Sequence, residues 1–350
     1  MSAPALIDVL PAHRFDEERL GAYLAGRVPG LERGGIAIRQ FQGGQSNPTF
    51  RLDTGAGSFV LRKKPPGPLL PSAHQVEREY RVIAALHGSG VPVPRPILLC
   101  EDADVIGTAF YVMEFVDGRV FERPDLPDLD PAERGAIYDA MNETLAALHQ
   151  VDWKAAGLEG FGKPENYLAR QVDRWARQYR ASIVGEADPV MEELIAWLGA
   201  NMPAESRTTI AHGDFRLGNL LFAQGAPRVA AVLDWELSTL GDPLGDLAYC
   251  CLPYHLPAGL PGVKGLVGAN LTALGIPSEE EFVAAYCRRT GRAGIAGWTF
   301  YLTFALFRLA AIVQGVYARA VQGNASSANA LEVGKRATLL ARTAHGLAMG

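Results

Sequence analysis

Two different hydrophobic patterns divide this chain. In the first third, short apolar runs alternate with polar residues and are bounded by glycines and prolines, which is typical of strands. From residue 131 onward, apolar residues recur at helical spacing over longer stretches, which predicts amphipathic helices. The pattern therefore predicts an α+β protein, with a small β-rich lobe over residues 1–115 and a larger, mainly helical lobe over residues 116–350.

The predicted elements follow from these runs. In the first lobe, strands are expected at 36–41, 50–53, 59–64, 97–100 and 110–116, and helices at 13–27 and 74–86. In the second, helices are expected at 131–150, 166–182, 191–198, 279–289, 298–320 and 328–349, with a Gly/Pro-rich loop at 252–278 on the substrate side. The stretch 298–313 is the most apolar, but it is short for a bilayer span and contains Arg308. We expect a buried helix in which Arg308 either pairs structurally or points into a substrate cleft.

Composition narrows the class of protein. The chain has 350 residues, of which 48% are hydrophobic and 20% charged, so it can bury a core. A net charge of -5 gives no general case for binding nucleic acid. The four cysteines form no C-x-x-C pair, which argues against a zinc site or a disulfide framework and suits a reducing compartment. With no signal peptide evident, we expect a cytoplasmic protein with a small-molecule partner and no membrane partner.

The stretch from residue 210 to residue 236 carries the strongest candidate chemistry. Asp214 and Asn219 lie in one loop, and Asp234 follows an apolar run. The two apolar runs after Asn219 predict strands joined by a turn, which would bring these three side chains to one end of a hairpin. Asp214 could then accept a proton from a hydroxyl, while Asn219 and Asp234 hold Mg²⁺ on a triphosphate. Turn residues that bond their own backbone are the alternative interpretation.

The same residues resemble a known family. His212, Asp214 and Asn219 form the pattern H-x-D-x-x-x-x-N of the kinase catalytic loop. The phrases HGDFRLGN, VLDWE and GDPLGDLAY resemble the aminoglycoside phosphotransferase (APH) and choline kinase-like family. The resemblance implies a bilobal protein kinase-like fold, the cofactors ATP and Mg²⁺, and phosphoryl transfer to an alcohol. It also implies that His212 orients the loop and that Asp246 braces it.

A glycine-containing loop between two predicted strands is a candidate phosphate site. Its sequence is GGQSNPT, and the candidate contacts are Gly43, Gly44, Ser46 and Asn47. Glycines let backbone N–H groups approach a phosphate, and a serine adds a hydroxyl donor. A plain hairpin turn is the alternative, although the loop resembles the GGxSN loop of APH-like proteins.

Arg62 and Glu79 form a candidate pair. Strand alternation puts Arg62 on one face and Lys63 on the other. In the kinase pattern V-A-I-K, the lysine stands where Arg62 stands here, and arginine offers phosphate a bidentate fork. Glu79 falls on the inward stripe of its helix, where a carboxylate needs a cationic partner. Lys63 competes if the register shifts by one residue; a basic strand edge and an ordinary surface charge are the interpretations without function.

The hinge and the substrate side are assigned less directly. By resemblance, the phrase FYVMEFVDG is the hinge, where the backbone of Glu114 and Val116 would bond adenine. The helix 166–182 carries several arginines beside an apolar stripe, which suits an anionic ligand, although a solvated face is the alternative. We assign to the substrate side Arg170, Arg174, Trp175, Tyr179 and Glu236.

Within the family, the closest resemblance is to one subgroup. The phrases FQGGQSNPTF, VLRKKPPG, EYRVIAALH and VLDWELSTLGDPL are similar to the kinase-like domain attached to some acyl-CoA dehydrogenases. That resemblance implies an anionic hydroxy acid or hydroxyacyl-CoA as the acceptor. The chain departs from the pattern at Gly218, where family members usually carry Asp. An aminoglycoside phosphotransferase and a nucleotide-binding protein without catalysis remain alternatives.

Overall fold

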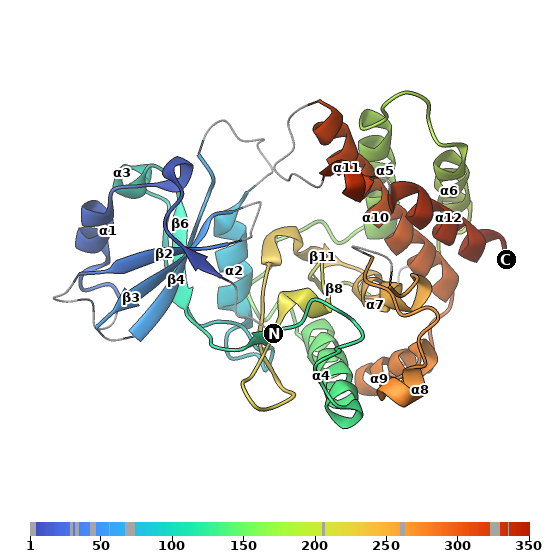
Figure 1. Cartoon of the computed structure of the whole chain (residues 1–350), viewed down its shortest axis with the longest axis horizontal. Coiled ribbons are helices and arrows are strands. Elements are labelled where there is room, and N and C mark those ends of the chain that lie inside the picture. The colour runs from blue at the N-terminus through green and yellow to red at the C-terminus, as the bar shows by residue number, and fades with distance from the viewer. Residues whose placement is uncertain are drawn as a thin grey trace. The chain divides into compact units, whose positions relative to one another are not determined.

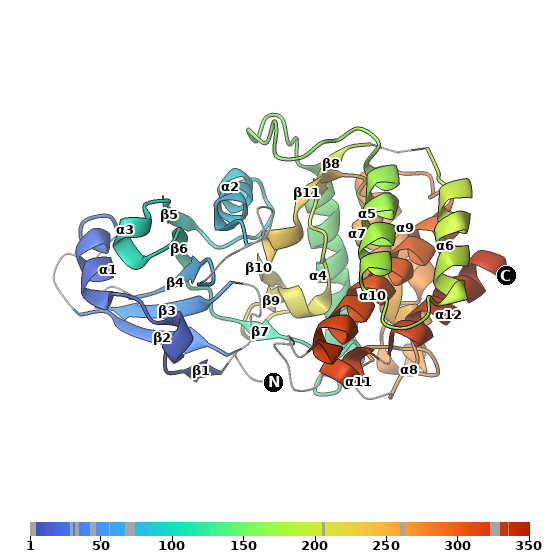
Figure 2. The ribbon, with the colours of Figure 1, turned by 90° about the horizontal axis from the view of Figure 1, so that it is seen from above.

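The computed structural model describes residues 5–28, 31, 35–42, 47–55, 57–66, 74–204, 207–259, 263–322, 330–334 and 336–350. The chain folds into two compact units (Figures 1 and 2). The first comprises Met1–Val120, Lys154–Leu158 and Asn219–Ser238, and the second comprises Phe121–Trp153, Glu159–Gly218 and Thr239–Gly350. The sequence prediction divided the chain once, at 115/116, whereas the first unit here also takes two later segments.

The first unit is built on a six-stranded sheet in the order β1-β2-β3-β4-β6-β5, with every neighbouring pair antiparallel. Its strands are β1 (Leu6–Ile7), β2 (Ala37–Phe41), β3 (Thr49–Thr54), β4 (Gly57–Lys63), β5 (Pro96–Cys100) and β6 (Phe110–Glu114). The five strands expected from alternation are present, and only the two-residue β1 was not foreseen. Alternating burial is clear in β3, whereas β6 buries the four consecutive residues Phe110 to Met113.

Three helices accompany this sheet: α1 (Glu17–Leu24), α2 (Val76–Leu86) and α3 (Ala103–Ile106), with a short 3-10 helix η1 (Pro11–His13) before them. Asp16 caps α1 as expected, because its carboxylate accepts from the amide of Arg19. Leu20 and Leu24 of α1 join Phe50 and Phe110 in one buried cluster on the sheet. Helix α2 buries Glu79 together with its apolar stripe, which positions a carboxylate inside the unit.

A second, three-stranded sheet completes the first unit. It has the order β10-β9-β7 and contains β7 (Arg119–Val120), β9 (Leu220–Phe222) and β10 (Val229–Val232). The β9–β10 hairpin joins this unit through the amide of Val232, which donates to the carbonyl of Pro92 at 2.8 Å. Helix α2 also meets the 3-10 helix η3 (Trp235–Leu237) that follows the hairpin. The hairpin therefore carries Asn219 and Asp234 into the same unit as Arg62 and Glu79.

The second unit is mainly helical. Its helices are α4 (Pro131–Gln150), α5 (Tyr167–Ala181), α6 (Pro189–Ala200), α7 (Leu244–Cys251), α8 (Leu271–Leu274), α9 (Glu279–Thr290), α10 (Trp298–Val321), α11 (Ala330–Gly334) and α12 (Arg336–Met349). The 3-10 helices η2 (Leu217–Asn219) and η4 (Leu252–His255) and the strand pair β8 (Thr209–Ala211) and β11 (Thr239–Gly241) complete the described elements. Helix α4 begins as its sequence predicts, because the Asp130 carboxylate accepts from the Glu133 amide at 2.9 Å.

Helix α10 is the central helix of the second unit. It packs against α5, α7, α11 and α12. By length and composition it could cross a membrane, but 67% of its most apolar window is buried within the protein. This agrees with the expected buried helix. It carries Arg308 against the loop that holds Asp214.

Candidate active site

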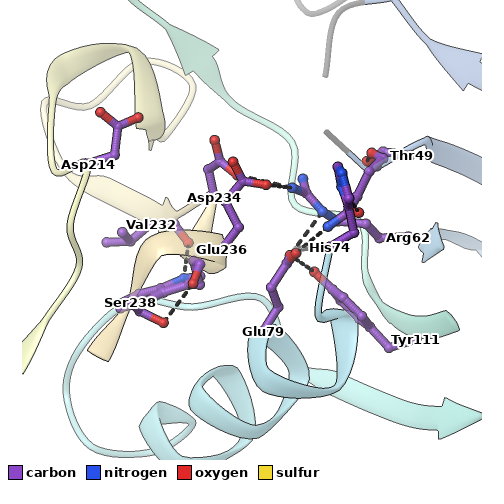
Figure 3. Close-up of polar contacts among 12 residues, drawn as sticks. Thr49, Arg62, His74, Glu79, Tyr111, Asp214, Val232, Asp234, Glu236 and Ser238 are labelled. Carbon is purple, nitrogen blue, oxygen red and sulfur yellow. Dashed lines mark hydrogen bonds and ion pairs between the residues drawn. The ribbon is translucent and has the colours of Figure 1, made fainter. Parts of the chain in front are cut away.

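Arg62 and Glu79 form the ion pair that the sequence predicts (Figure 3). Arg62 on β4 places Nε 2.9 Å from Oε2 of Glu79 on α2, and the two side chains are 13% and 2% exposed. Lys63 points the other way, with Nζ 5.7 Å from the ring centre of Phe15. Strand alternation therefore puts Arg62, and not Lys63, on Glu79, while the phosphate contact itself stays a prediction.

Glu79 is held by two further donors. The hydroxyl of Tyr111 donates to Oε2 at 3.1 Å, and Nδ2 of Asn47 donates to Oε1 at 2.6 Å. Burial raises the pKa of Glu79 to about 7, while the charge of Arg62 opposes this shift. Burial lowers the pKa of Arg62, but the Glu79 carboxylate more than compensates and leaves that pKa raised. Arg62 therefore stays charged, whereas burial opposes the ionisation of Glu79, which is partial near neutral pH.

Asn47 was predicted as a phosphate-loop residue. The structure places its side chain on Glu79, and its Oδ1 lies 3.1 Å from a ring nitrogen of His74. A phosphate contact at Asn47 stays a prediction. Its role here is to fix the carboxylate that fixes Arg62. The other loop residues of that prediction lie outside the described residues: Gly43, Gly44 and Ser46.

Two acidic side chains approach Arg62 from the segment after β10. Nη2 of Arg62 lies 3.0 Å from Oδ1 of Asp234 and 3.8 Å from Oε2 of Glu236 (Figure 3). Asp234 has φ 66° and ψ 61°, a left-handed conformation that costs a non-glycine residue about 1–3 kcal/mol. The turn that follows is fixed by Trp235 Nε1, which donates to the Val232 carbonyl at 3.0 Å. Backbone strain of this kind accumulates at functional positions, where it aims a side chain.

Asn219 and Asp234 are brought together by strand pairing. Leu220 of β9 is paired with Val232 of β10, and the amide of Leu233 donates to the carbonyl of Asn219 at 2.9 Å. A carboxylate and an amide oxygen are hard ligands that fit Mg²⁺. No group of three or more His, Cys, Asp or Glu side chains able to hold a metal is found in the described part of the chain. Magnesium binding by Asn219 and Asp234 stays a prediction.

Asp214 lies in the second unit, in the loop after β8. Nε of Arg216 lies 3.3 Å from its Oδ2, and the hydroxyl of Tyr249 is also hydrogen-bonded to this carboxylate. Burial lowers the pKa of Arg216, but Asp214 outweighs it and leaves the pKa raised. Burial raises the pKa of Tyr249, and the charge of Asp214 adds to that shift. At neutral pH, Asp214 therefore has a cationic partner in Arg216 and a neutral partner in Tyr249.

Asp246 of α7 braces this loop. Its carboxylate accepts from the amide of His212 at 2.6 Å and from the amide of Gly213 at 2.9 Å. Nε2 of the fully buried His149 lies 3.4 Å away. Burial would raise the pKa of Asp246, but these partners keep it below the ordinary value. His212 in turn accepts from the Asp214 amide through Nδ1 at 3.2 Å, which agrees with the orienting role implied by resemblance.

We expect Asp246→Asn to lower the free energy of unfolding by about 2–4 kcal/mol, because an amide leaves a buried backbone donor unmatched. Urea unfolding measures this change, with Asp173→Asn on an exposed ion pair as the control. A carboxylate with a lowered pKa stabilises the fold above its ordinary pKa and loses this effect as the pH falls. The difference in free energy of unfolding between wild type and Asp246→Asn should therefore become smaller below about pH 4. Equal unfolding curves for both variants would contradict the bracing role.

The contacts of Arg308 in α10 show which of its two expected roles, structural pairing or pointing into a substrate cleft, it has. Its guanidinium donates to the carbonyl of Gly213 and lies 5.3 Å from the ring centre of Trp175 and 5.4 Å from that of Tyr249. Cations over aromatic faces are stabilised when desolvated. Arg308 therefore holds the backbone next to Asp214, which is the structural role.

A model of the phosphotransferase enzyme family, APH, matches residues 37–301. The chain belongs to this APH family. It is 48% identical to mouse acyl-CoA dehydrogenase family member 10 over 94% of this chain and 31% of that protein. It is 47% identical to human acyl-CoA dehydrogenase family member 11 over 92% of this chain and 42% of that protein. The chain thus spans less than half the length of these curated relatives.

Solved structures agree with the family. A protein from Ralstonia eutropha, provisionally named an aminoglycoside phosphotransferase, is 49% identical with a TM-score of 0.87, covering 96% of this chain and 98% of that one. A spectinomycin phosphotransferase in complex with ADP and spectinomycin has a TM-score of 0.62 at 13% identity, covering 95% and 98%. At that identity the second match shows the fold alone. The chain therefore carries a domain of the phosphotransferase enzyme family with a protein kinase-like fold.

The predicted substrate arginines make local contacts in the described structure. Arg170 donates to the carbonyl of Lys163, and Arg174 lies exposed with its guanidinium 5.7 Å from the ring centre of Trp175. Tyr179 is buried, and its hydroxyl accepts from the Asp188 amide at 2.9 Å. Their substrate role, like that of Glu236, stays a prediction.

The predicted hinge residues Glu114 and Val116 lie at the end of strand β6 and just after it. The amide of Glu114 donates to the carbonyl of Arg95 at 2.9 Å, so an adenine contact at Glu114 would fall to its carbonyl. Val116 is partly buried just beyond the strand. Adenine binding at Glu114 and Val116 stays a prediction.

A pocket in the second unit was not predicted. It has a volume of about 280 Å³ and is lined by Arg216 and Tyr249, which both contact Asp214. The expected substrate loop at 252–278 contributes Leu252, Pro253, Leu256 and Lys264 to its wall. The other lining residues could not be recognised in the sequence, because they are apolar and apolar residues are equally common in a protein core.

Gly218 explains how Arg216 reaches its place. A Cβ at Gly218 would lie 2.4 Å from Nη1 of Arg216 and 3.4 Å from the Glu122 carboxylate. A side chain here would displace the guanidinium. The lack of a side chain at Gly218 leaves room for the Arg216 guanidinium.

Proposed function

We propose that this protein transfers the γ-phosphoryl group of Mg-ATP to the hydroxyl of an anionic small molecule, a hydroxy acid or a hydroxyacyl-CoA. The observation that supports phosphoryl transfer most is the group of Arg62, Glu79 and Asp234, since it joins a buried phosphate-binding cation to a candidate metal ligand. The observation that supports an anionic acceptor is Arg216 on Asp214, at the pocket.

Different residues of the chain would accept the proton, bind the phosphates and hold the metal. Asp214 accepts the proton of the acceptor hydroxyl, because a carboxylate held by Arg216 and Tyr249 has a fixed direction. Arg62 holds phosphate oxygens, and Glu79 keeps its guanidinium extended from β4. Asn219 and Asp234 are the residues that would hold Mg²⁺. Bound Mg-ATP supplies the phosphoryl group and the metal charge that balances the phosphates. Catalysis of this kind depends on positioning and electrostatics.

The relatives support the acceptor class without establishing it. Two are named acyl-CoA dehydrogenase family members, and this chain covers 31% and 42% of their lengths. An APH-family protein can equally modify aminoglycosides, which are polycations. A cationic acceptor would meet the Arg216 guanidinium at the pocket, which disfavours it, while Lys264 is paired with Glu122.

A coupled ADP-release assay with Mg-ATP tests the proposal. The acceptors are hydroxyacyl-CoA thioesters, free hydroxy acids, aminoglycosides, choline and sugars, and each is compared with ATP alone to subtract hydrolysis. We expect acceptor-dependent ADP release with a hydroxyacyl-CoA or a hydroxy acid. Release with aminoglycosides alone would contradict the anionic acceptor and retain the chemistry. Binding of Mg-ATP without release for any acceptor would favour a protein that binds nucleotide without catalysis.

A further inference from the structure

The polar contacts that hold Arg62 continue beyond Glu79 to His74, a residue that the reaction described so far does not use. Oε1 of Glu79 accepts from Nδ2 of Asn47 at 2.6 Å, and Oδ1 of the same carboxamide lies 3.1 Å from Nδ1 of His74 (Figure 3). Glu79 and Asn47 are buried, whereas His74 is partly exposed. The contacts therefore run without a break from the ring of His74 to the guanidinium of Arg62.

The direction of each hydrogen bond in this series is set by its neighbour. An ionised carboxylate only accepts, so Asn47 turns its NH2 group toward Glu79. The carbonyl oxygen of Asn47 then faces His74, and the ring donates from Nδ1. The series therefore needs a donor at His74 and is broken when that donor is removed.

The backbone of His74 supports a fixed position for its ring. Its φ is 59°, a left-handed conformation that non-glycine residues keep only where the surrounding structure imposes it. His74 lies two residues before α2, and the N-cap residue Gln75 makes no side-chain capping bond. The contact with Asn47 therefore ties the start of the helix that carries Glu79 to the segment before β3.

The backbone of Asn47 is itself fixed to the strand that carries Arg62. The hydroxyl of Thr49 donates to the carbonyl of Asn47 at 3.1 Å, and Thr49 is paired with Arg62 across β3 and β4. The amide of Lys63 donates to the carbonyl of the next residue, Pro48, at 3.1 Å. With its backbone held in this way, Asn47 can move mainly by turning its carboxamide, and His74 restricts that rotation.

We propose that His74 is a positioning residue of the nucleotide site: by holding the Asn47 carboxamide, it keeps Glu79 and Arg62 in the geometry that binds phosphate. This inference rests on the proposed function, because that proposal assigns phosphate binding to Arg62. The whole series lies in the first unit, whereas Asp214 lies in the second. His74 should therefore affect the binding of ATP and leave the binding of the acceptor unchanged.

Two substitutions at position 74 separate the donor from the backbone conformation, because glycine and asparagine both tolerate a positive φ. His74→Gly removes the donor and should raise the dissociation constant of Mg-ATP about twofold to tenfold, the range for one lost hydrogen bond. His74→Asn keeps a donor, since Nδ2 of asparagine is bonded to Cγ as Nδ1 is in histidine. It should recover most of the lost affinity.

A double-mutant cycle tests whether His74 acts through Asn47. Asn47→Ala leaves a buried oxygen of Glu79 without this donor and should weaken Mg-ATP binding at least about fivefold. In that background His74→Gly should have no further effect, because the series is already broken. His87→Gly, at an exposed histidine at the other end of α2, is the matched control and should bind Mg-ATP as wild type does.

Calorimetry with Mg²⁺ and a non-hydrolysable ATP analogue measures these affinities without an acceptor, and urea unfolding checks that each variant is folded. Where an acceptor is turned over, KM for ATP should rise in His74→Gly while KM for the acceptor stays within about twofold of wild type.

The outcomes separate the two proposals. Unchanged affinity in His74→Gly, a loss that adds to that of Asn47→Ala, or a loss that His74→Asn does not restore would overturn the role of His74 and leave the kinase proposal intact. The predicted affinities without phosphorylation of any acceptor would support His74 and overturn the proposed reaction. Absence of Mg-ATP binding in wild type would overturn both.

Discussion

Asp214→Asn is expected to reduce kcat by about 10²- to 10⁴-fold, the range that general-base catalysis contributes. The amide has nearly the shape of the carboxylate, so it still reaches Arg216 and Tyr249, but it cannot accept the hydroxyl proton. Arg216 also loses its ionic partner and becomes free to reorient. The dissociation constant for Mg-ATP should change less than about twofold, because the residues assigned to ATP and metal are unchanged.

Single-turnover kinetics and calorimetric ATP binding measure the two quantities separately. Asp173→Asn, which alters only an exposed ion pair with Arg177, is the control for expression and folding. A variant that keeps kcat within threefold of wild type would show that Asp214 is not the base. A variant that loses Mg-ATP binding as well would show that its role is structural.

Asp234→Asn is expected to remove Mg²⁺-dependent turnover, with a loss of about 10³-fold, since a bound metal supplies several kcal/mol of charge stabilisation. Asparagine is the cleanest replacement because it tolerates the left-handed backbone that Asp234 adopts. The substitution removes the negative charge that would hold the metal and that now lies 3.0 Å from Arg62. The turn itself should persist through the Trp235 contact.

Turnover as a function of Mg²⁺ concentration measures this effect. Glu236→Gln is the matched variant, because Glu236 lies farther from Arg62, at 3.8 Å, and was not assigned to the metal. We expect Glu236→Gln to keep the wild-type magnesium dependence. A magnesium dependence in Asp234→Asn equal to that of wild type would place the metal elsewhere.

Much of the first unit is readable from the sequence because its signals are local. Strand alternation separates Arg62 from Lys63, and helical spacing puts Glu79 inward. The β9–β10 hairpin between Asn219 and Asp234 also follows from the two apolar runs that specify its strands. These predictions succeed because each depends on the geometry of one or two adjacent elements.

The remaining features depend on long-range packing. The β9–β10 hairpin joins the first unit through a hydrogen bond to Pro92, more than a hundred positions away in the sequence. Neither segment has a sequence pattern that predicts this contact. Asn47 has the composition of a phosphate loop, yet its side chain serves Glu79. The pocket gathers apolar side chains from distant segments that look like any core residues.

The distribution of charge along the sequence predicted side-chain contacts less well than strand alternation and helical spacing did. The arginines of α5 predict an anionic ligand. Arg177 pairs with Asp173 and Arg180 with Glu192, and the substrate role of Arg170 and Arg174 stays a prediction. Arg216, a single arginine in a loop, contacts Asp214 instead. A run of like charges does not reveal its partners, because those partners are set by tertiary structure.

The most direct test of the central claim is mass spectrometry of the acceptor after incubation with Mg-ATP whose γ-phosphoryl oxygens are isotopically heavy. The account predicts that the hydroxyl-bearing acceptor gains one phosphoryl group with its heavy oxygens and keeps its own hydroxyl oxygen as the bridge. It also predicts that Asp214→Asn does not form this product. Heavy label found only in inorganic phosphate, with every acceptor unchanged in mass, would contradict it.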